Sequence, residues 1–185
     1  ALYTFLSYLP KYVNGPITSG GLGVELDSSL FIYLILIPSI VSIFSLLFGG
    51  FLADSLIKKG HNILNVRRSV NSIGFFGSAV FLYMISLQDS MYQVLLLLCL
   101  INLCSGICAG GFGVNHADLG PKYTGSLVGI SGSLGMLAAI SSPIVAGYVL
   151  EISNSWNSIF YICSSVLIFG GIFYLFFSSA TKQFE

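Results

Sequence analysis

The chain has 185 residues, of which 55% are hydrophobic and only 8% carry a charge. An ordinary globular domain has roughly 25% charged residues, so this composition cannot cover a water-soluble surface. Seven basic and seven acidic side chains balance to a formal charge of zero, which gives no general electrostatic attraction to nucleic acid. A lipid bilayer is therefore the expected partner of this chain, and nucleic acid is not.

Apolar stretches separated by short charged segments predict six helices. The first, 1–14, is expected to be the end of a helix that begins upstream, because it is short and lacks the features of a signal peptide. Five longer stretches follow, at 28–53, 69–88, 90–113, 123–149 and 155–179. At about 1.5 Å per residue, the stretch 28–53 reaches roughly 39 Å, more than a hydrocarbon core of roughly 30 Å requires. The expected fold class is all-α transmembrane.

Basic residues are unevenly distributed between the loops of this arrangement. If the first helix leaves the membrane at Lys11, successive loops fall on alternate sides. Lys11 is the only basic residue on the first side, and the second side holds Lys58, Lys59, Arg67, Arg68, Lys122 and Lys182. Short loops rich in lysine and arginine stay in the cytoplasm, so the second side is predicted to be cytoplasmic.

Glycines occur inside the predicted helices as well as between them. Gly106 and Gly110 recur at helical spacing, as do Gly125 and Gly129 in the following helix. Small residues let helix backbones approach closely in lipid, where apolar burial gives no driving force between helices. These glycines are predicted to lie at helix contacts, which are either fixed packing surfaces or surfaces along which helices slide.

Asp54 follows the apolar stretch 28–53 at its predicted cytoplasmic end. A carboxylate at the C-terminus of a helix opposes the helix dipole, so Asp54 should seek a cation such as Lys58, Arg67 or Arg68, or the N-terminus of another helix. We expect these residues to form a latch that closes the cytoplasmic side. The alternative is that Asp54 simply ends the apolar run in water.

Between the third and fourth long stretches lies a polar segment that contains Asn115, His116 and Asp118. Two ligands are too few for a metal site, so we expect this segment to be structural and the chain to hold no metal or cofactor. No nucleophile, base and orienting group can be assembled, which argues against an enzyme. The interiors of the predicted spans also lack acids, lysines, arginines and histidines, so any ion coupling should depend on residues outside this chain.

Polar side chains inside the predicted spans have two possible roles. Asn102 and Ser105 lie on one face of their helix, and Tyr3 and Tyr12 lie in the first helix. Such groups either bond to neighbouring helices, the more common case, or face a water-filled path. Anchoring at the membrane interface is the expected role of Tyr12.

Several short stretches together form a recognisable pattern along nearly the whole chain. They are Leu9, Pro10 and Tyr12; Gly50, Ala53 and Asp54; Val66, Arg67 and Arg68; Gly111, Phe112, Val114, Asn115, His116, Asp118, Pro121, Tyr123 and Gly125; Gly129, Ile130 and Ser131; and Trp156, Phe160, Tyr161 and Ile162. In these stretches the chain resembles the C-terminal half of the major facilitator superfamily, in the anion:cation symporter family of sialin, the vesicular glutamate transporters and plant phosphate transporters.

This resemblance implies a twelve-helix carrier of which residues 1–185 form the C-terminal six-helix bundle, helices 7 to 12. The N-terminal six-helix half would be its partner, with substrate bound between the halves and alternating access moving one against the other. The family pattern would turn Tyr3, Asn102 and Ser105 toward a substrate cavity, with Ser131 a weaker candidate. Two departures stand out, because Gly113 replaces a frequent asparagine and Ala117 a usual leucine.

The first functional hypothesis is secondary active transport of a small organic or inorganic anion, coupled to protons or sodium. The second is a transporter-like membrane protein that has lost transport and serves as a receptor or assembly partner. Membrane-depth charges in the other half would distinguish the two, since coupled transport depends on such residues. A passive channel is disfavoured because the sequence contains no ring of charges and no filter-like segment.

Overall fold

A computed structural model describes residues 2–25 and 27–181, without the side chains of residues 2, 3, 5 and 6. The elements in chain order are α1 (Leu2–Asn14), η1 (Ile17–Ser19), α2 (Ser28–Lys58), α3 (Ile63–Ile85), α4 (Met91–Cys108), η2 (Ala109–Gly113), α5 (Val114–Leu119), η3 (Pro121–Tyr123), α6 (Thr124–Ser153) and α7 (Trp156–Phe177). Of the short elements, η1 and η3 are 3-10 helices and η2 is a π-helical turn.

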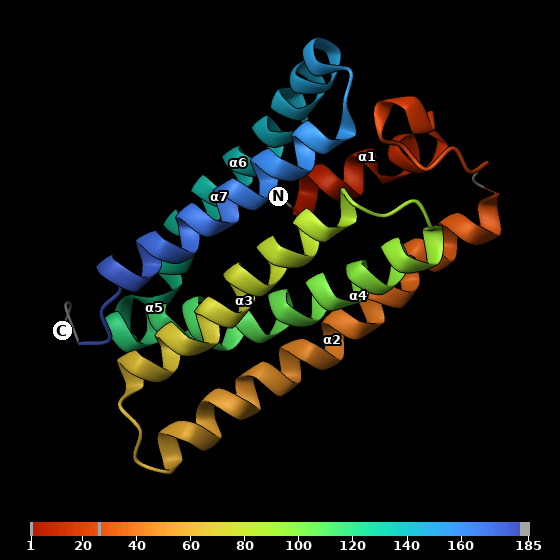
Figure 1. Cartoon of the computed structure of the whole chain (residues 1–185). Coiled ribbons are helices and arrows are strands. Elements are labelled where there is room, and N and C mark those ends of the chain that lie inside the picture. Colours follow the sequence, from red (N-terminus) through yellow and green to blue (C-terminus); the bar gives the residue numbers. More distant parts are fainter. Residues whose placement is uncertain (1, 26, 182–185) are drawn as a thin grey trace.

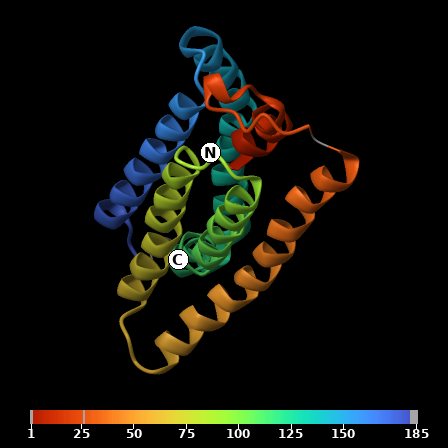
Figure 2. The same cartoon turned by 45° about the vertical axis from the view of Figure 1, so that its right-hand side comes forward.

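The long helices form a bundle in which α4 packs against α2 and α3, and α3 packs against α7 (Figure 1). Figure 2 shows α2 at one edge of the bundle, on the opposite side from α7. Helix α6 contacts α1, α5 and α7. The α2–α3 loop, α5 and the end of α7 lie at one end of the bundle, and the α3–α4 and α6–α7 loops lie at the other (Figure 1).

Four helical segments in the described part of the chain are long and apolar enough to cross a membrane: Ser28–Lys58, Met91–Leu119, Pro121–Ser153 and Trp156–Phe177. Helix α3 runs among them and has 23 residues. It buries Asn71 and Ser78 against its neighbours. Contacts within the bundle therefore cover these two polar side chains, which lower the hydropathy of α3.

Helix α2 ends at Lys58, five residues beyond the end at 53 that the charge pattern predicts. It continues past Asp54 to Lys58 and ends where Gly60 adopts a left-handed conformation with φ of 88°. The Gly60 amide donates to the carbonyl of Ile57. Glycine tolerates this conformation without a Cβ penalty, so the glycine and not the first charged residue terminates the helix.

Helix α3 begins six residues before the predicted start at 69. The Asn62 side chain accepts hydrogen bonds from the amides of Leu64 and Asn65, which otherwise have no partner at a helix N-terminus. Arg67 and Arg68 consequently lie in the second turn of the helix and not in the loop before it.

The fourth helix does not end at residue 113, as the sequence predicted. After Cys108 the backbone widens into the π-helical turn η2, which holds three glycines, and then continues as α5 to Leu119. Asn115 is buried inside α5. The polar segment 114–119 is therefore a helical extension whose side chains have defined directions.

Aromatic residues close the end of the bundle that lies away from α5. Tyr12 meets Trp156 and Phe160 edge-on, with ring centroids 5.6 and 5.1 Å apart. Tyr12 is only 1% exposed, so it is a core residue and not the interfacial anchor that the sequence suggested. Edge-to-face pairs of this kind add roughly 0.5–1.5 kcal/mol beyond the area that they bury.

The predicted glycine contacts divide into two groups. Gly106 and Gly110 lie where α4 and η2 cross α2, and a Cβ at Gly106 would meet the Ser45 side chain at 2.6 Å. The Ser45 hydroxyl donates to the carbonyl of Leu103 at the same crossing. Gly125 and Gly129 on α6 have open space around them. Helix α6 buries only Ala146 among its described residues, although its sequence is apolar.

Candidate functional site

Arg67 is the centre of a buried polar cluster at the end of the bundle that contains α5. Its Nε donates to Asp118 Oδ2 at 2.8 Å, and Nη2 lies 3.4 Å from Asp118 Oδ1. Its Nη1 donates to the carbonyl of Gly110 at 2.7 Å. The Arg67 side chain is 5% exposed and that of Asp118 is 19% exposed. Arg67 thus joins α3 to both the π-helical turn and α5.

The π-helical turn explains why the arginine is held there. A π-helical insertion disturbs the regular hydrogen-bond ladder, and a carbonyl at such a place needs another donor. The guanidinium of Arg67 supplies that donor to Gly110 while two further N–H groups face the Asp118 carboxylate. The planar fork of arginine suits this double task, which a lysine ammonium could not perform with the same geometry.

The predicted gate residues do not form one cluster. Asp54 and Lys58 are exposed on the last turns of α2, and Asp54 has no ion pair or hydrogen bond to any residue that the structure describes. Arg68 Nε donates to the Ser178 hydroxyl oxygen at 2.9 Å, and Arg68 Nη2 donates to the Ser178 carbonyl at 3.0 Å. Arg67 was one of several cations expected to attract Asp54, but the extension of the fourth helix places Asp118 beside Arg67.

The residues predicted for the substrate cavity are likewise separated. The Tyr3 side chain lies outside the described residues. The Asn102 amide is half-buried and donates to the Leu98 carbonyl of its own helix at 2.9 Å. Ser105 lines a cavity of about 150 Å³ between α3, α4 and α7, which is mainly apolar. Ser131 lies elsewhere, on the exposed side of α6.

Ser131 forms a pair with His116 across the α5–α6 contact. Ser131 Oγ lies 3.0 Å from His116 Nε2, and His116 Nδ1 lies 3.4 Å from the carbonyl of Gly113. Ser131 Oγ is also 3.2 Å from the carbonyl of Val128, one turn earlier in α6. Both side chains line a cavity of about 420 Å³ whose other walls include Phe112.

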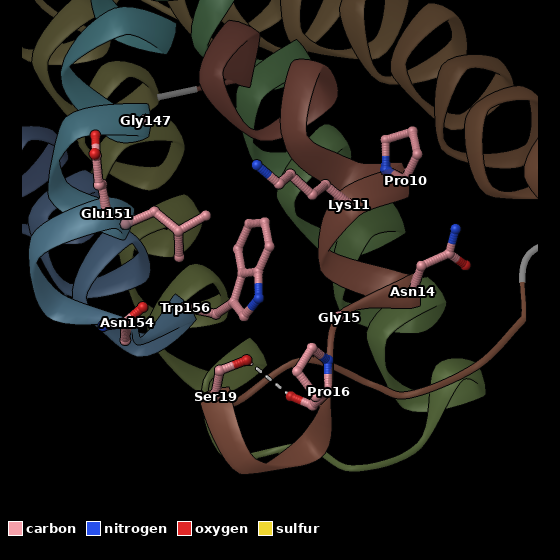
Figure 3. A pocket seen from close by; sticks show the side chains of 11 residues that line it. Pro10, Lys11, Asn14, Gly15, Pro16, Ser19, Gly147, Glu151, Asn154 and Trp156 are labelled. Carbon is pink, nitrogen blue, oxygen red and sulfur yellow. Dashed lines mark hydrogen bonds between the residues drawn. The ribbon is translucent and has the colours of Figure 1, made fainter.

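A larger hollow of about 700 Å³ lies at the opposite end of the bundle. Figure 3 shows Trp156 between Lys11 and Asn14 on one side and Glu151 and Asn154 on the other. Its walls carry one cation and one carboxylate, so charge alone gives this hollow no preference for an anion. The pair of His116 and Ser131 is the more selective arrangement, because a protonated imidazole would be the single charge facing its cavity.

Comparison with known proteins now decides the family. The family model of the Major Facilitator Superfamily matches residues 1–183. This chain belongs to that superfamily. Its fold is therefore the all-α transmembrane bundle of these carriers, and the protein is an integral, multi-pass membrane protein.

Relatives in three organisms agree with the resemblance seen in the sequence. Probable anion transporter 1, chloroplastic, of Oryza sativa subsp. japonica is 31% identical over 180 residues, which cover 97% of this chain and 32% of that protein. Sodium-dependent phosphate transport protein 1, chloroplastic, of Arabidopsis thaliana is 31% identical over 134 residues, 72% of this chain and 26% of that protein. Sialin of Homo sapiens is 29% identical over 185 residues, 98% and 36% respectively.

The chain is much shorter than these relatives. It spans only 26% to 36% of the length of the three relatives. The resemblance to anion carriers of the major facilitator superfamily is confirmed, and it extends over nearly all of the present residues.

Sequence reasoning missed His116 as a candidate functional residue because it placed this histidine in a structural loop. A signal was nevertheless present. Phe112 and His116 are four residues apart, the spacing that puts two side chains on one helical face. A helix predicted to continue through Gly110, Gly111 and Gly113 would have had both side chains on the same surface. In the structure both line one cavity.

Proposed function

We propose that this chain is the C-terminal six-helix half of a secondary active transporter that moves a small organic or inorganic anion by alternating access. Transport is coupled to protons or sodium, and the substrate binds between this half and an N-terminal six-helix half. The observation that carries the proposal is the similarity to carriers named for anion and sodium-dependent phosphate transport, over at least 72% of this chain.

The exposure of α6 supports a second half. Within the segment Pro121–Ser153, only 6% of the residues in the most apolar stretch are buried. Glycines such as Gly125 and Gly129 leave the surface of α6 open. Small residues favour close packing of helices in lipid. Together with the greater length of the relatives, this argues that another bundle covers part of α6.

We further propose that Asp54 and Lys58 act as a cytoplasmic gate, in which the exposed Asp54 carboxylate binds a partner in the other half when the carrier closes. Arg67 and Arg68 act differently in this proposal. Arg67 is hydrogen-bonded to Asp118 and Arg68 to Ser178. In this proposal both arginines hold the neighbouring helices in place while the end of α2 makes the closing contact.

The substrate-cavity assignments remain part of the same proposal. Tyr3, Asn102 and Ser105 would contribute from α1 and α4, and Ser131 from α6. Asn102 supports this role through its free amide oxygen, since its nitrogen donates within the helix while no bond to the oxygen is formed among the described residues.

Uptake by the full-length protein in proteoliposomes tests the proposal. The substrates would be phosphate, an acidic sugar, an acidic amino acid and a nucleotide, each with an inward proton or sodium gradient. We expect uptake of at least one anion, driven by one of the two gradients and abolished when an ionophore collapses it. Absence of gradient-driven uptake for every anion would contradict transport and favour a receptor or assembly role.

A further inference from the structure

We propose that His116 and Ser131 form a proton-gated subsite for an anion of the size of phosphate. This inference rests on the proposed transport of an anion and assigns that anion a contact. Three features support it: a histidine paired across two helices, a hydroxyl that can exchange hydrogen-bond partners, and a cavity beside both of them.

The geometry lets the pair take up a proton without separating. When the imidazole is neutral with hydrogen on Nδ1, Nδ1–H points to the carbonyl of Gly113 and Nε2 accepts from the Ser131 hydroxyl. When a proton binds Nε2, that N–H donates to Ser131 Oγ, and the hydroxyl hydrogen turns to the carbonyl of Val128. Both arrangements use oxygen atoms that already lie within 3.4 Å of their partners.

Protonation changes the charge on the cavity wall. Histidine is the side chain whose charge ordinarily changes near neutral pH. The cavity of about 420 Å³ is otherwise lined by Phe112, Val128, Met136 and glycines. An imidazolium would therefore be the only full charge on that wall, and it would attract an anion that the neutral imidazole does not.

Few charged or titratable groups lie on the elements packed around His116. On α5 the other one is Asp118, which is bound to Arg67 of α3. The 3-10 turn η3 carries the exposed Lys122 and the exposed Tyr123, while η2 has none. Helix α6 has no ionisable side chain between residue 124 and Tyr148, near its far end.

Direct binding of radiolabelled inorganic phosphate to the purified full-length protein tests this subsite between pH 5.5 and pH 8, values chosen to bracket the ordinary pKa of about 6.5 for histidine. Affinities are compared as the ratio of wild type to variant at each pH, which cancels the titration of phosphate itself. His116→Gln should bind about 10-fold more weakly than wild type at the acidic end and about equally at the alkaline end, as expected for the loss of one partly screened charge on the cavity wall.

Three further variants make the test specific. His116→Lys keeps a cation at every pH, so it should retain acid-level binding and lose the pH dependence. Ser131→Ala should weaken binding at every pH but keep the dependence. His61→Gln is the matched control, because His61 is the other histidine of the chain and is exposed in the α2–α3 loop. It should behave as wild type.

Several results would overturn the subsite. They are a wild-type pH dependence in His116→Gln, an equal loss in His61→Gln, or no phosphate binding by the wild type at acidic pH. Monodispersity of each variant in gel filtration is required, and His116→Lys decides the matter if His116→Gln does not fold. Uptake of other anions would still uphold the proposed function, whereas failure of all gradient-driven uptake would contradict that function itself.

Discussion

The buried pair of Arg67 and Asp118 makes a strong prediction about stability. Arg67 is 5% exposed and offers three N–H groups, two to Asp118 and one to the carbonyl of Gly110. Removing one member of such a pair leaves a buried charge unpaired, which costs about 3–5 kcal/mol. Asp118 is 19% exposed and can be partly hydrated, so Arg67→Met should cost about 2–4 kcal/mol and Asp118→Leu about 3–5 kcal/mol.

The double variant should be much less destabilised than the sum of the two single variants. Arg67→Met with Asp118→Leu removes both charges, and apolar replacements of buried ion pairs are often neutral. What remains is the carbonyl of Gly110 without its donor, a loss of about 1–3 kcal/mol. The pair therefore has a coupling free energy of several kcal/mol, well above the roughly 0.5 kcal/mol scatter of independent sites.

The measurement is a double-mutant cycle on the full-length protein, by urea unfolding in detergent micelles followed with circular dichroism. Arg68→Met is the control, because Arg68 is half-buried and binds only the Ser178 oxygens among the described residues. It should cost no more than about 1 kcal/mol. If the two single effects add up in the double variant, the pair is not coupled and the role given to Arg67 is wrong.

Three other predictions follow from single contacts. Gly110→Ala should destabilise the protein by about 1–3 kcal/mol, because a Cβ would press on Gly49, whereas Gly50→Ala, with open space, should not; thermal unfolding distinguishes them. Asp54→Asn should leave thermal stability unchanged but increase the labelling of cytoplasmic-side cysteine probes. Unchanged labelling would contradict the proposed gate. Bonds from the Ser29 hydroxyl and the Ser28 amide lower the pKa of Asp27. The stabilisation from Asp27 is thus full above about pH 3.9 and lost as pH falls through the lower folded pKa, so the advantage of wild type over Asp27→Asn in melting temperature should shrink in acid.

The helices were largely predictable because their signals are local. An apolar run long enough to cross lipid is a property of consecutive residues, as is the capping glycine at residue 60. The errors arose where a charge was taken as the end of a helix, since Asp54 and Arg67 both lie inside helices. Both signals are present in the sequence. Gly60 marks the end of α2, and Asn62, a typical N-cap residue, marks the start of α3.

The candidate site was less predictable, because it depends on helix phase beyond an irregular turn. The π-helical turn at 109–113 changes the angular positions of the side chains that follow it around the helix axis. In the resulting positions Asp118 contacts Arg67 and His116 contacts Ser131. Spacing along the chain gives neither pairing, since the partners are 51 and 15 residues apart. The gate and cavity residues were named from a family pattern, which carries no such distances.

The sequence by itself determined that this protein lies in a membrane, that it is helical and that its basic residues gather at one end, because composition and charge order act through local free energies of transfer. The tertiary structure alone decided which acid neutralises Arg67, which glycines serve as contacts and which hydroxyl meets His116. Those outcomes depend on the packing of helices far apart in the chain, where a shift of one residue in phase would exchange every partner.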